Sequence, residues 1–291
     1  MKENMNKNLL AITFMILSAL SFSIMGAMVK QVSNLPLSEA VFFRNLVSTL
    51  IALSICIGKK IPVFRKEQNT KLLLIRALLG LLGVMGYFYS IRNLPLADAA
   101  TLNRMSPFFV LIFSFFYLKE RINKYQVFAV ILAFLGIALV IRPEFNYTVL
   151  PSLIGLGSAV IAGLAYTIVR KLSHTEHPSV IVLYFSVISV IGTLPLLIMN
   201  FVKPSPIELL YLLLTGVFAA GGQYALTYSY KLAKASEVSI YSYATVIFSA
   251  IIGYLLWHEM LSALSIIGIC VVLLAGFLNF KFSEKTKVSV D

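Results

Sequence analysis

Ten apolar stretches fill almost the whole chain of 291 residues, and each is long enough to cross a lipid bilayer. They cover residues 9–29, 38–57, 72–91, 99–118, 125–142, 152–170, 179–200, 207–230, 237–257 and 262–281. A helix needs ~20 residues to cross a hydrocarbon core. Only 12% of residues are charged, and the mean hydropathy is +0.90. Because helices satisfy their own backbone groups in hydrocarbon, the sequence predicts an all-α integral membrane protein with ten transmembrane helices.

The basic residues predict the orientation of these helices. With a cytoplasmic N-terminus, 17 of the 24 Lys and Arg fall in inside segments, four in outside segments, and three (Arg44, Arg76, Arg104) within spans. This is the bias of the positive-inside rule. We therefore expect a multi-pass protein of the cytoplasmic membrane with both termini in the cytoplasm. The same bias explains the net charge of +12 without a nucleic-acid partner.

The second half of the chain repeats the first. A shift of 139 residues places "SIRNLPLADAATLNRMSPFFVLIFSFFYLKER" over "SYKLAKASEVSIYSYATVIFSAIIGYLLWHEM", and Glu120 then meets Glu259. Each copy holds five helices, an odd number, so the second copy is expected upside down in the membrane. The sequence thus predicts two inverted five-helix repeats, 9–142 and 152–281, between tails at 1–8 and 282–291. Inverted repeats are typical of secondary transporters.

These motifs resemble one family in particular. "PLSEAVFFRN", "LADAATLNRMSPFF" and "KASEVSIYSYATVIFSAIIGYLLWHE" are similar to segments of the drug/metabolite transporter superfamily, of the kind built from two tandem EamA domains. The resemblance covers nearly the full length. It implies alternating access by a proton- or gradient-coupled carrier, often an exporter of metabolites, with its cavity between the two halves. It says little about the substrate.

Arg104 is the sharpest candidate for a binding residue. It lies roughly 8 Å into the fourth predicted span at 1.5 Å per residue, and charges at such depth tend to face a cavity. Pro107 has no N–H, so the carbonyl of Asn103 loses its helical partner. The arginine, the amide and this carbonyl form a corner suited to a carboxylate or phosphate. The alternative is that Arg104 snorkels or pairs with Asp98 or Glu39.

Polar stripes and tyrosines supply the other candidates. Asn103, Ser106 and Ser114 share one face of the fourth span, and Ser242, Thr245 and Ser249 share the equivalent face of the ninth. Such hydroxyls also serve dry helix packing, and tyrosines also form interfacial belts. The predicted substrate-binding residues are Arg104, Asn103, Ser106, Tyr87, Gln223, Tyr224, Tyr228, Ser242 and Thr245.

The remaining charges are expected to have structural roles. Arg44 is expected to pair with Glu39 or Asp98, and Arg76 to snorkel from the start of the third span. The twelve acids lie in loops, in tails or near helix ends, so a proton relay on a central carboxylate is unsupported. Cys56 and Cys270 offer no metal-ligand spacing. No catalytic set lies in mid-span and no nucleotide-binding loop is present, so we expect neither an enzyme nor a metal or other cofactor.

The sequence favours a secondary transporter that exports a small organic metabolite by alternating access, with the substrate and the lipid bilayer as its partners. A multidrug or lipid carrier of the same fold is the first alternative, and it would need a more apolar cavity. A channel or a membrane assembly subunit is a second alternative, and a homodimer is left open. Export is favoured by the resemblance alone. The residues do not identify the substrate or the coupling ion.

Overall fold

The computed structural model describes residues 2–63, 69–118, 124–141, 149–172, 175–232 and 239–288. Every regular element in these ranges is a helix, as predicted. The helices are α1 Lys2–Gln31, α2 Leu37–Gly58, α3 Thr70–Asn93, α4 Leu96–Asn103, α5 Ser106–Leu118, α6 Lys124–Ile141, α7 Val149–Leu172, α8 Pro178–Asn200, α9 Pro206–Leu232, the 3₁₀ helix η1 Ser239–Tyr243, α11 Ala244–Trp257 and α12 Ala263–Val288.

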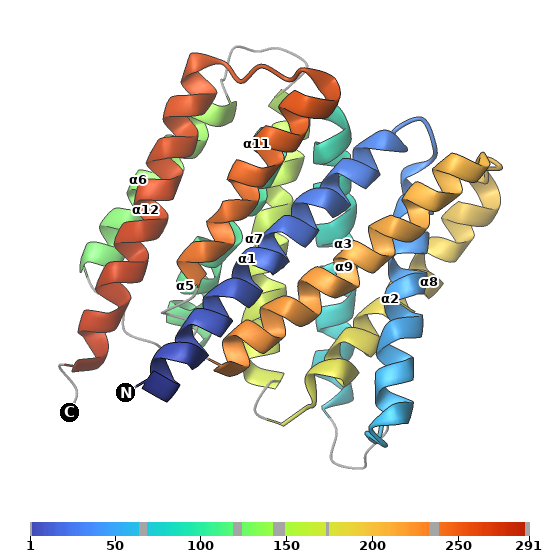
Figure 1. Cartoon of the computed structure of the whole chain (residues 1–291), viewed down its shortest axis with the longest axis horizontal. Coiled ribbons are helices and arrows are strands. Elements are labelled where there is room, and N and C mark those ends of the chain that lie inside the picture. Colours follow the sequence, from blue (N-terminus) through green and yellow to red (C-terminus); the bar gives the residue numbers. More distant parts are fainter. Residues whose placement is uncertain are drawn as a thin grey trace.

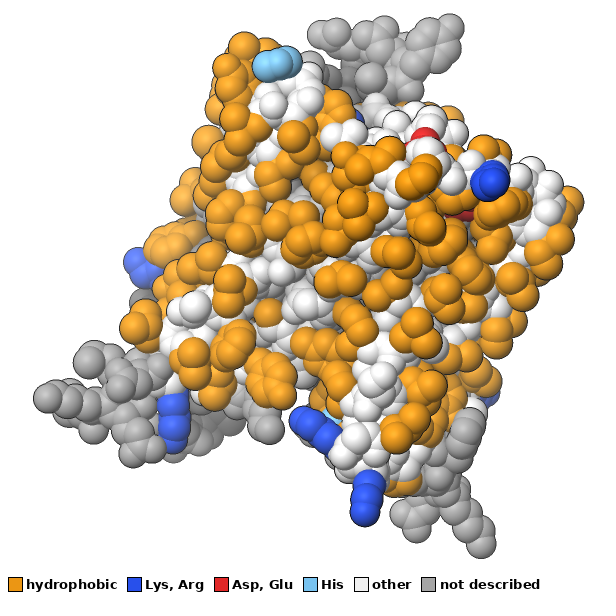
Figure 2. All heavy atoms as spheres, turned by 45° about the vertical axis from the view of Figure 1, so that its right-hand side comes forward, with side chains coloured by type: hydrophobic (Ala, Val, Ile, Leu, Met, Phe, Trp, Pro, Cys, Tyr) orange, Lys and Arg blue, Asp and Glu red, His pale blue; other side chains and the backbone are white. Residues whose placement is uncertain are grey.

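The length and composition of these helices fit a lipid bilayer. Seven helices in the described ranges are long and apolar enough to cross a membrane, and Tyr241–Trp257 and Ala263–Asn279 are shorter apolar helices. Large apolar side chains point outward, among them Ile198 at 72% exposure and Phe116 at 69%. Figure 2 shows a face dominated by apolar side chains, with the visible Lys and Arg toward its edges. The chain is therefore a multi-pass membrane protein.

The predicted span at 99–118 is interrupted, which corrects the expected continuous helix, and the span at 237–257 changes its helix type part-way along. α4 ends at Asn103 and α5 begins at Ser106, with Arg104 and Met105 in the turn between them. Pro107, the second residue of α5, has no N–H to continue the ladder of α4. In the second half, η1 passes into α11 between Tyr243 and Ala244.

The helices pack in pairs from opposite halves of the chain. α1 packs against α9, α7 against α3, α2 against α8, and α6 against α12. In Figure 1 the α6–α12 pair forms one edge of the bundle and the α2–α8 pair the other. Backbone contact between α6 and α12 requires glycine, because a Cβ on Gly268 would lie 2.6 Å from the carbonyl oxygen of Gly136. The largest buried cluster, which includes Phe88, Met105 and Phe108, lies between the two edges.

The two ends of the bundle differ in the connections they carry. At the end drawn at the top of Figure 1, here called the upper end, lie the connections 31–37, 93–96, 200–206 and 257–263. At the lower end α1 begins and α12 ends. The α4–α5 break and the η1–α11 junction lie between these two ends.

Candidate functional site

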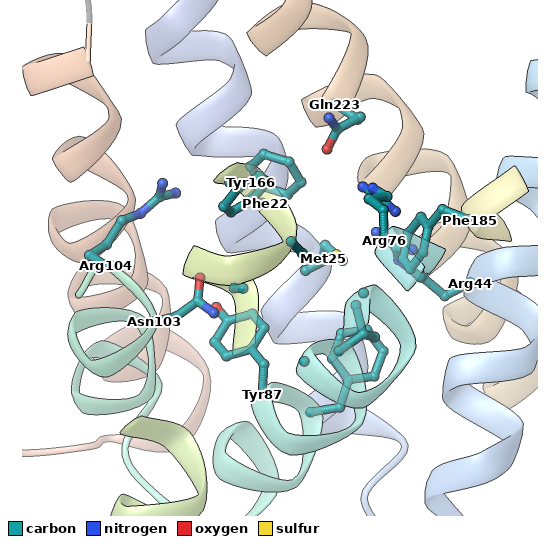
Figure 3. A pocket seen from close by; sticks show the side chains of 16 residues that line it. Phe22, Met25, Arg44, Arg76, Tyr87, Asn103, Arg104, Tyr166, Phe185 and Gln223 are labelled. Carbon is teal, nitrogen blue, oxygen red and sulfur yellow. The ribbon is translucent and has the colours of Figure 1, made fainter. Parts of the chain in front are cut away.

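A cavity of about 110 Å³ lies among the helices close to the break between α4 and α5. Side chains from α1, α2, α3, α4, α7, α8 and α9 line it (Figure 3). Its charged and polar lining residues are Arg44, Arg76, Arg104, Asn103, Gln223, Tyr87 and Tyr166, and its larger apolar ones are Phe22, Met25, Phe88 and Phe185. The cavity thus carries three guanidinium groups and no carboxylate among its lining residues.

Arg104 lies where the end of α4 meets α11. It directly follows α4, and its guanidinium donates a hydrogen bond to the hydroxyl of Thr245 in α11. That hydroxyl donates in turn to the carbonyl of Ser242, at 2.9 Å. Thr245 is a neutral partner, so the positive charge of Arg104 is oriented but not neutralised. A guanidinium held in this way at a cavity wall is suited to bind an anionic group of a ligand.

The expected structural partners of Arg104 are engaged elsewhere. Glu39 accepts a hydrogen bond from the backbone N–H of Val202, at 2.7 Å. Asp98 accepts one from the hydroxyl of Ser265, at 3.3 Å. The alternative in which Arg104 pairs with one of these acids therefore has no support among the described contacts. In Figure 3 the side chain of Arg104 borders the cavity.

Four of the predicted binding residues come together at this cavity: Arg104, Asn103, Tyr87 and Gln223. In Figure 3, Arg104 and Asn103 lie on one side and Gln223 on the other. Tyr87 comes from α3 and Gln223 from α9, so three separate helices supply the set. The polarity of Gln223 deep in an apolar span was the signal that identified it.

The tyrosines predicted on α9 lie outside the cavity. Tyr228 is 44% exposed, and its ring stacks on Phe14 of α1 with 5.9 Å between ring centroids. Tyr224 directly follows Gln223, and consecutive residues point about 100° apart on a helix. Since Gln223 faces the cavity, Tyr224 does not line it. A tyrosine inside a span is therefore no indication of a cavity by itself.

The predicted hydroxyl stripes serve mainly as packing surfaces. Ser23 of α1 donates to the carbonyl of Thr245 at 3.0 Å, and Ser249 donates to the hydroxyl of Ser23 at 3.3 Å. Ser242 and Ser106 are buried and do not line the cavity. Hydroxyls at helix contacts in membranes commonly bond to carbonyls in this way. Of the stripes, Asn103 lines the cavity and Thr245 contacts it through Arg104.

Glu120 and the side chain of Ser114, both part of the predicted motifs, fall outside the described part of the chain. Within the described ranges, no three His, Cys, Asp or Glu side chains lie close enough together to hold a metal ion.

Arg44 and Arg76 form a second basic group at the cavity, which the sequence reasoning missed. Their guanidinium carbons lie 5.1 and 4.2 Å from the ring centroid of Phe185. Both side chains are buried, at 8% and 7% exposure. The Arg44 guanidinium donates to Asn45 at 2.6 Å, whereas Nε of each arginine and Nη1 of Arg76 have no hydrogen-bond partner in the part of the chain that the structure describes.

This arrangement corrects two expectations. Arg44 does not pair with Glu39 or Asp98, and Arg76 does not snorkel to the surface. A cation–π contact contributes about 0.5–2 kcal/mol, whereas an unpaired buried charge costs several kcal/mol. The contacts with Phe185 therefore offset only part of the free-energy cost of burying the two charges. The sequence contained an indication of this basic group, because three spans carry arginines whereas no acid lies in mid-span to pair with them.

A polar cluster lies at the upper end of the bundle. His258 adopts a left-handed conformation, with φ of 53°, and ends α11. The turn directs Glu259 back into the bundle, where it forms an ion pair with Lys30 and accepts the Leu96 N–H at 2.8 Å. Lys30 also donates to the carbonyl of Leu94, at 2.7 Å. The cluster thus ties α1 and α11 to the start of α4.

Gly253 lies directly beside this cluster. A Cβ at Gly253 would lie 2.5 Å from a carboxylate oxygen of Glu259. The carboxylate therefore occupies the space that a larger residue would fill. Lys30 in addition lies 5.4 Å from the ring centroid of Trp257. We define these residues, Lys30, Leu94, Leu96, Trp257 and Glu259, as the upper cluster.

Comparisons with known proteins agree with this architecture. The model of the EamA-like transporter family matches twice, over residues 9–142 and 150–281. Pseudopaline exporter CntI of Pseudomonas aeruginosa is 36% identical over 264 residues, which cover 89% of this chain and 92% of that protein. Solute carrier family 35 member G1 of Homo sapiens is 25% identical, over 90% of this chain and 77% of that protein.

Two further matches extend the comparison. The S-adenosylmethionine uptake transporter of Rickettsia prowazekii is 24% identical over 99% of this chain and 98% of that protein. A solved crystal structure shares the fold, with a TM-score of 0.68 and 16% identity over 95% of this chain and 97% of that one. Because the family model covers both halves, the chain belongs to the EamA-like transporter family and, with it, to the drug/metabolite transporter superfamily.

Proposed function

We propose that this protein is a secondary carrier that exports a small organic anion from the cytoplasm by alternating access. The observation that carries the proposal is the guanidinium of Arg104, which lines a cavity beside the break between α4 and α5 and, among the residues that the structure describes, has the neutral hydroxyl of Thr245 as its hydrogen-bond partner. Half-helix ends at mid-membrane are typical of substrate sites in such carriers.

Alternating access needs two halves that exchange roles, and the packing supports such a relation. We propose ten membrane-crossing segments, with α4–α5 and η1–α11 counted as one each, arranged as two inverted repeats. The turn between α4 and α5 and the junction between η1 and α11 lie at equivalent positions, because the 139-residue shift places Arg104 over Tyr243 and Met105 over Ala244. The helix pairs agree as well, because the α1–α9 contact has its counterpart in α7–α3, and the α2–α9 contact in α8–α3.

Individual contacts support the same exchange of roles. Ser18 of α1 donates to the carbonyl of Gly222 in α9, at 2.7 Å. Ser158 of α7 lies against Gly83 of α3, where a Cβ on the glycine would be 3.6 Å from the Ser158 carbonyl. Gly83 and Gly222 are 139 residues apart, and Ser18 and Ser158 are 140 apart. Equivalent residues thus meet at equivalent helix contacts in both halves.

The proposed direction of transport rests on the distribution of basic residues and on the relatives. The basic residues favour a cytoplasmic lower end, where α1 begins and α12 ends, in the cytoplasmic membrane. The relative of 36% identity is named an exporter, while a more distant relative is named an uptake transporter. We favour export on the first of these. The three lining arginines disfavour a lipid or apolar-drug carrier, which would expose its apolar cargo to unpaired charge.

Efflux of a metabolite mixture from proteoliposomes tests the function while the substrate is still unidentified. Vesicles that contain purified protein are loaded with a small-molecule extract of cells, and mass spectrometry follows what leaves. We expect one or a few anions to leave faster from wild-type vesicles than from protein-free ones. Arg104→Gln should abolish this flux, and Arg104→Lys should reduce it, because lysine keeps the charge but loses the planar fork.

The matched control is Tyr228→Phe, which changes an exposed residue outside the cavity. It should leave the flux at the wild-type level. Each variant is also checked for monodispersity and thermal stability. Wild-type flux in Arg104→Gln would contradict the assignment of the site, and the absence of any protein-dependent flux would contradict the carrier function.

A further inference from the structure

The stack of Arg44, Phe185 and Arg76 faces the same cavity as Arg104. Figure 3 shows Arg104 with Asn103 on one side of the cavity and Arg76 with Arg44 on the other. Phe22 and Met25 of α1 lie between these groups in the same view. The cavity thus has two basic poles, here called the Arg104 pole and the paired-arginine pole, with apolar side chains between them.

No carboxylate balances the paired-arginine pole in the described part of the chain. The neutral amide of Asn45 accepts from Arg44 at 2.6 Å, and Phe185 contributes its ring face. Three guanidinium nitrogens, Nε of both arginines and Nη1 of Arg76, are buried without a hydrogen-bond partner among the described residues. Two adjacent cations in a low-dielectric interior repel each other and have lost their hydration. An oxyanion held between them would remove both penalties.

The fold provides for this stack. Gly80 leaves room for it, because a Cβ there would lie 2.7 Å from the Phe185 ring and 3.0 Å from Nη1 of Arg76. The ring of Phe185 contacts both guanidinium groups, Arg44 from α2 and Arg76 from α3, and so brings the two charges to one wall of the cavity. An arginine fork matches the two oxygens of a carboxylate or phosphate.

We propose that the paired-arginine pole is a second oxyanion site, so that the substrate is a small dianion with one acidic group at each pole and an apolar spacer. The two-pole site rests on the proposed function in one respect, because it identifies the bound dianion with the transported substrate. The cavity volume of about 110 Å³ restricts the spacer to a few atoms.

Binding of dicarboxylates to purified protein tests this proposal without any transport measurement. The probes are the straight-chain α,ω-dicarboxylates from malonate to suberate and their monomethyl esters, which keep the length but lose one charge. Calorimetry in a sulfonate buffer without chloride gives the affinities. At the best spacer length the dicarboxylate should bind at least about tenfold more tightly than its ester, because only it engages both poles.

The variants assign each charge to its pole. Arg76→Gln and Arg104→Gln should each lower the affinity for the best dicarboxylate to about that of the ester. Arg92→Gln is the matched control, since Arg92 lies on the same helix as Arg76 but donates to the carbonyl of Leu35 outside the cavity. Arg92→Gln should leave the ratio between the affinities for the dicarboxylate and for its ester unchanged. If Arg76→Gln does not fold, Gly80→Ala displaces the stack instead and should also reduce the ratio.

Several outcomes would overturn the proposal. Equal affinities for dicarboxylates and esters at every length, including no binding of either, would exclude a dianion site. Unchanged dicarboxylate binding in Arg76→Gln would exclude the paired-arginine pole. A titration with chloride or inorganic phosphate distinguishes a free anion from a substrate group. If either stabilises the wild type through Arg76 and dicarboxylates add nothing, the pole holds a free anion and the proposal is wrong.

Failure of this inference differs from failure of the proposed function. Binding at both poles without any flux from proteoliposomes would support the dianion site and contradict the carrier function. Arg104-dependent efflux of a monoanion would leave the carrier and remove the second anion site.

Discussion

The ion pair between Lys30 and Glu259 is expected to control how often the upper end opens. Glu259 joins three elements, because its carboxylate contacts Lys30 of α1 and the first N–H of α4 from the end of α11. Glu259→Gln keeps the shape of the side chain but removes its charge. The variant should therefore weaken the upper cluster while leaving the packing of α11 nearly unchanged.

The size of the effect follows from the contacts. The carboxylate accepts a charge-assisted bond at 2.8 Å from Leu96, and both ion-pair side chains are largely buried, at 14% and 15% exposure. A hydrogen bond to a charged group contributes about 1.5–3 kcal/mol. If these contacts exist only in the conformation closed at the upper end, their loss raises the open population by about tenfold to a hundredfold.

Thiol labelling measures this population. Leu94→Cys is introduced into a background of Cys56→Ala and Cys270→Ala, which removes the two native thiols. Leu94 is 5% exposed at the upper end, so an impermeant maleimide reaches residue 94 only when this end opens. With Glu259→Gln the labelling rate should rise by about the factor given above.

A carboxylate at the same end provides the control. Glu208 bonds to Asn34 and Ser205 near the start of α9 and does not take part in the upper cluster. Glu208→Gln should leave the labelling rate unchanged. Equal rates in wild type and Glu259→Gln, with both proteins folded, would refute the claim that the upper cluster holds this end closed.

Other parts of the structure predict separate results. Gly268→Leu should destabilise the protein by about 1–3 kcal/mol in thermal unfolding, because a Cβ there lies 2.6 Å from a carbonyl of α6. Gly157→Ala, where a Cβ meets nothing within 4 Å, should leave the thermal stability unchanged or raise it. Equal losses of stability in Gly268→Leu and Gly157→Ala would contradict the described contact between α6 and α12. Tyr228→Ala should leave ligand affinity unchanged, and a large loss of affinity would indicate that Tyr228 does contact the ligand. Cysteine in place of Lys203 should react with impermeant reagent on whole cells and cysteine in place of Lys60 only after permeabilisation; the reverse would invert the topology.

Hydropathy alone predicted where the helices lie, but it did not predict their interruptions. The stretches 38–57 and 179–200 agree with α2 and α8 to within about a residue at each end. The stretches 99–118 and 237–257 read as continuous because apolarity says nothing about backbone dihedrals. Pro107 marked the first break, whereas "SIYSYAT" at the second contains no proline or glycine.

The residues that line the cavity were predictable only where a polar residue stood inside an apolar span. Arg104 and Gln223 stood out as polar residues inside apolar spans. Phe185 could not be recognised, because an aromatic residue that lines a cavity and one that faces lipid look alike in a sequence. Arg44 was noticed but paired with nearby acids, and Arg76 was expected at the surface, since the ring that holds them comes from a distant part of the chain.

Counterflow in proteoliposomes tests the carrier claim most directly. Vesicles with wild-type protein are loaded with an excess of the unlabelled anion identified by the efflux measurement, and uptake of the labelled anion is followed from outside. A carrier whose single cavity opens to one side at a time predicts saturable uptake that unlabelled anion on the opposite side accelerates, and loss of both properties in Arg104→Gln. Uptake that rises linearly with concentration and ignores the anion on the other side would contradict alternating access and indicate a channel.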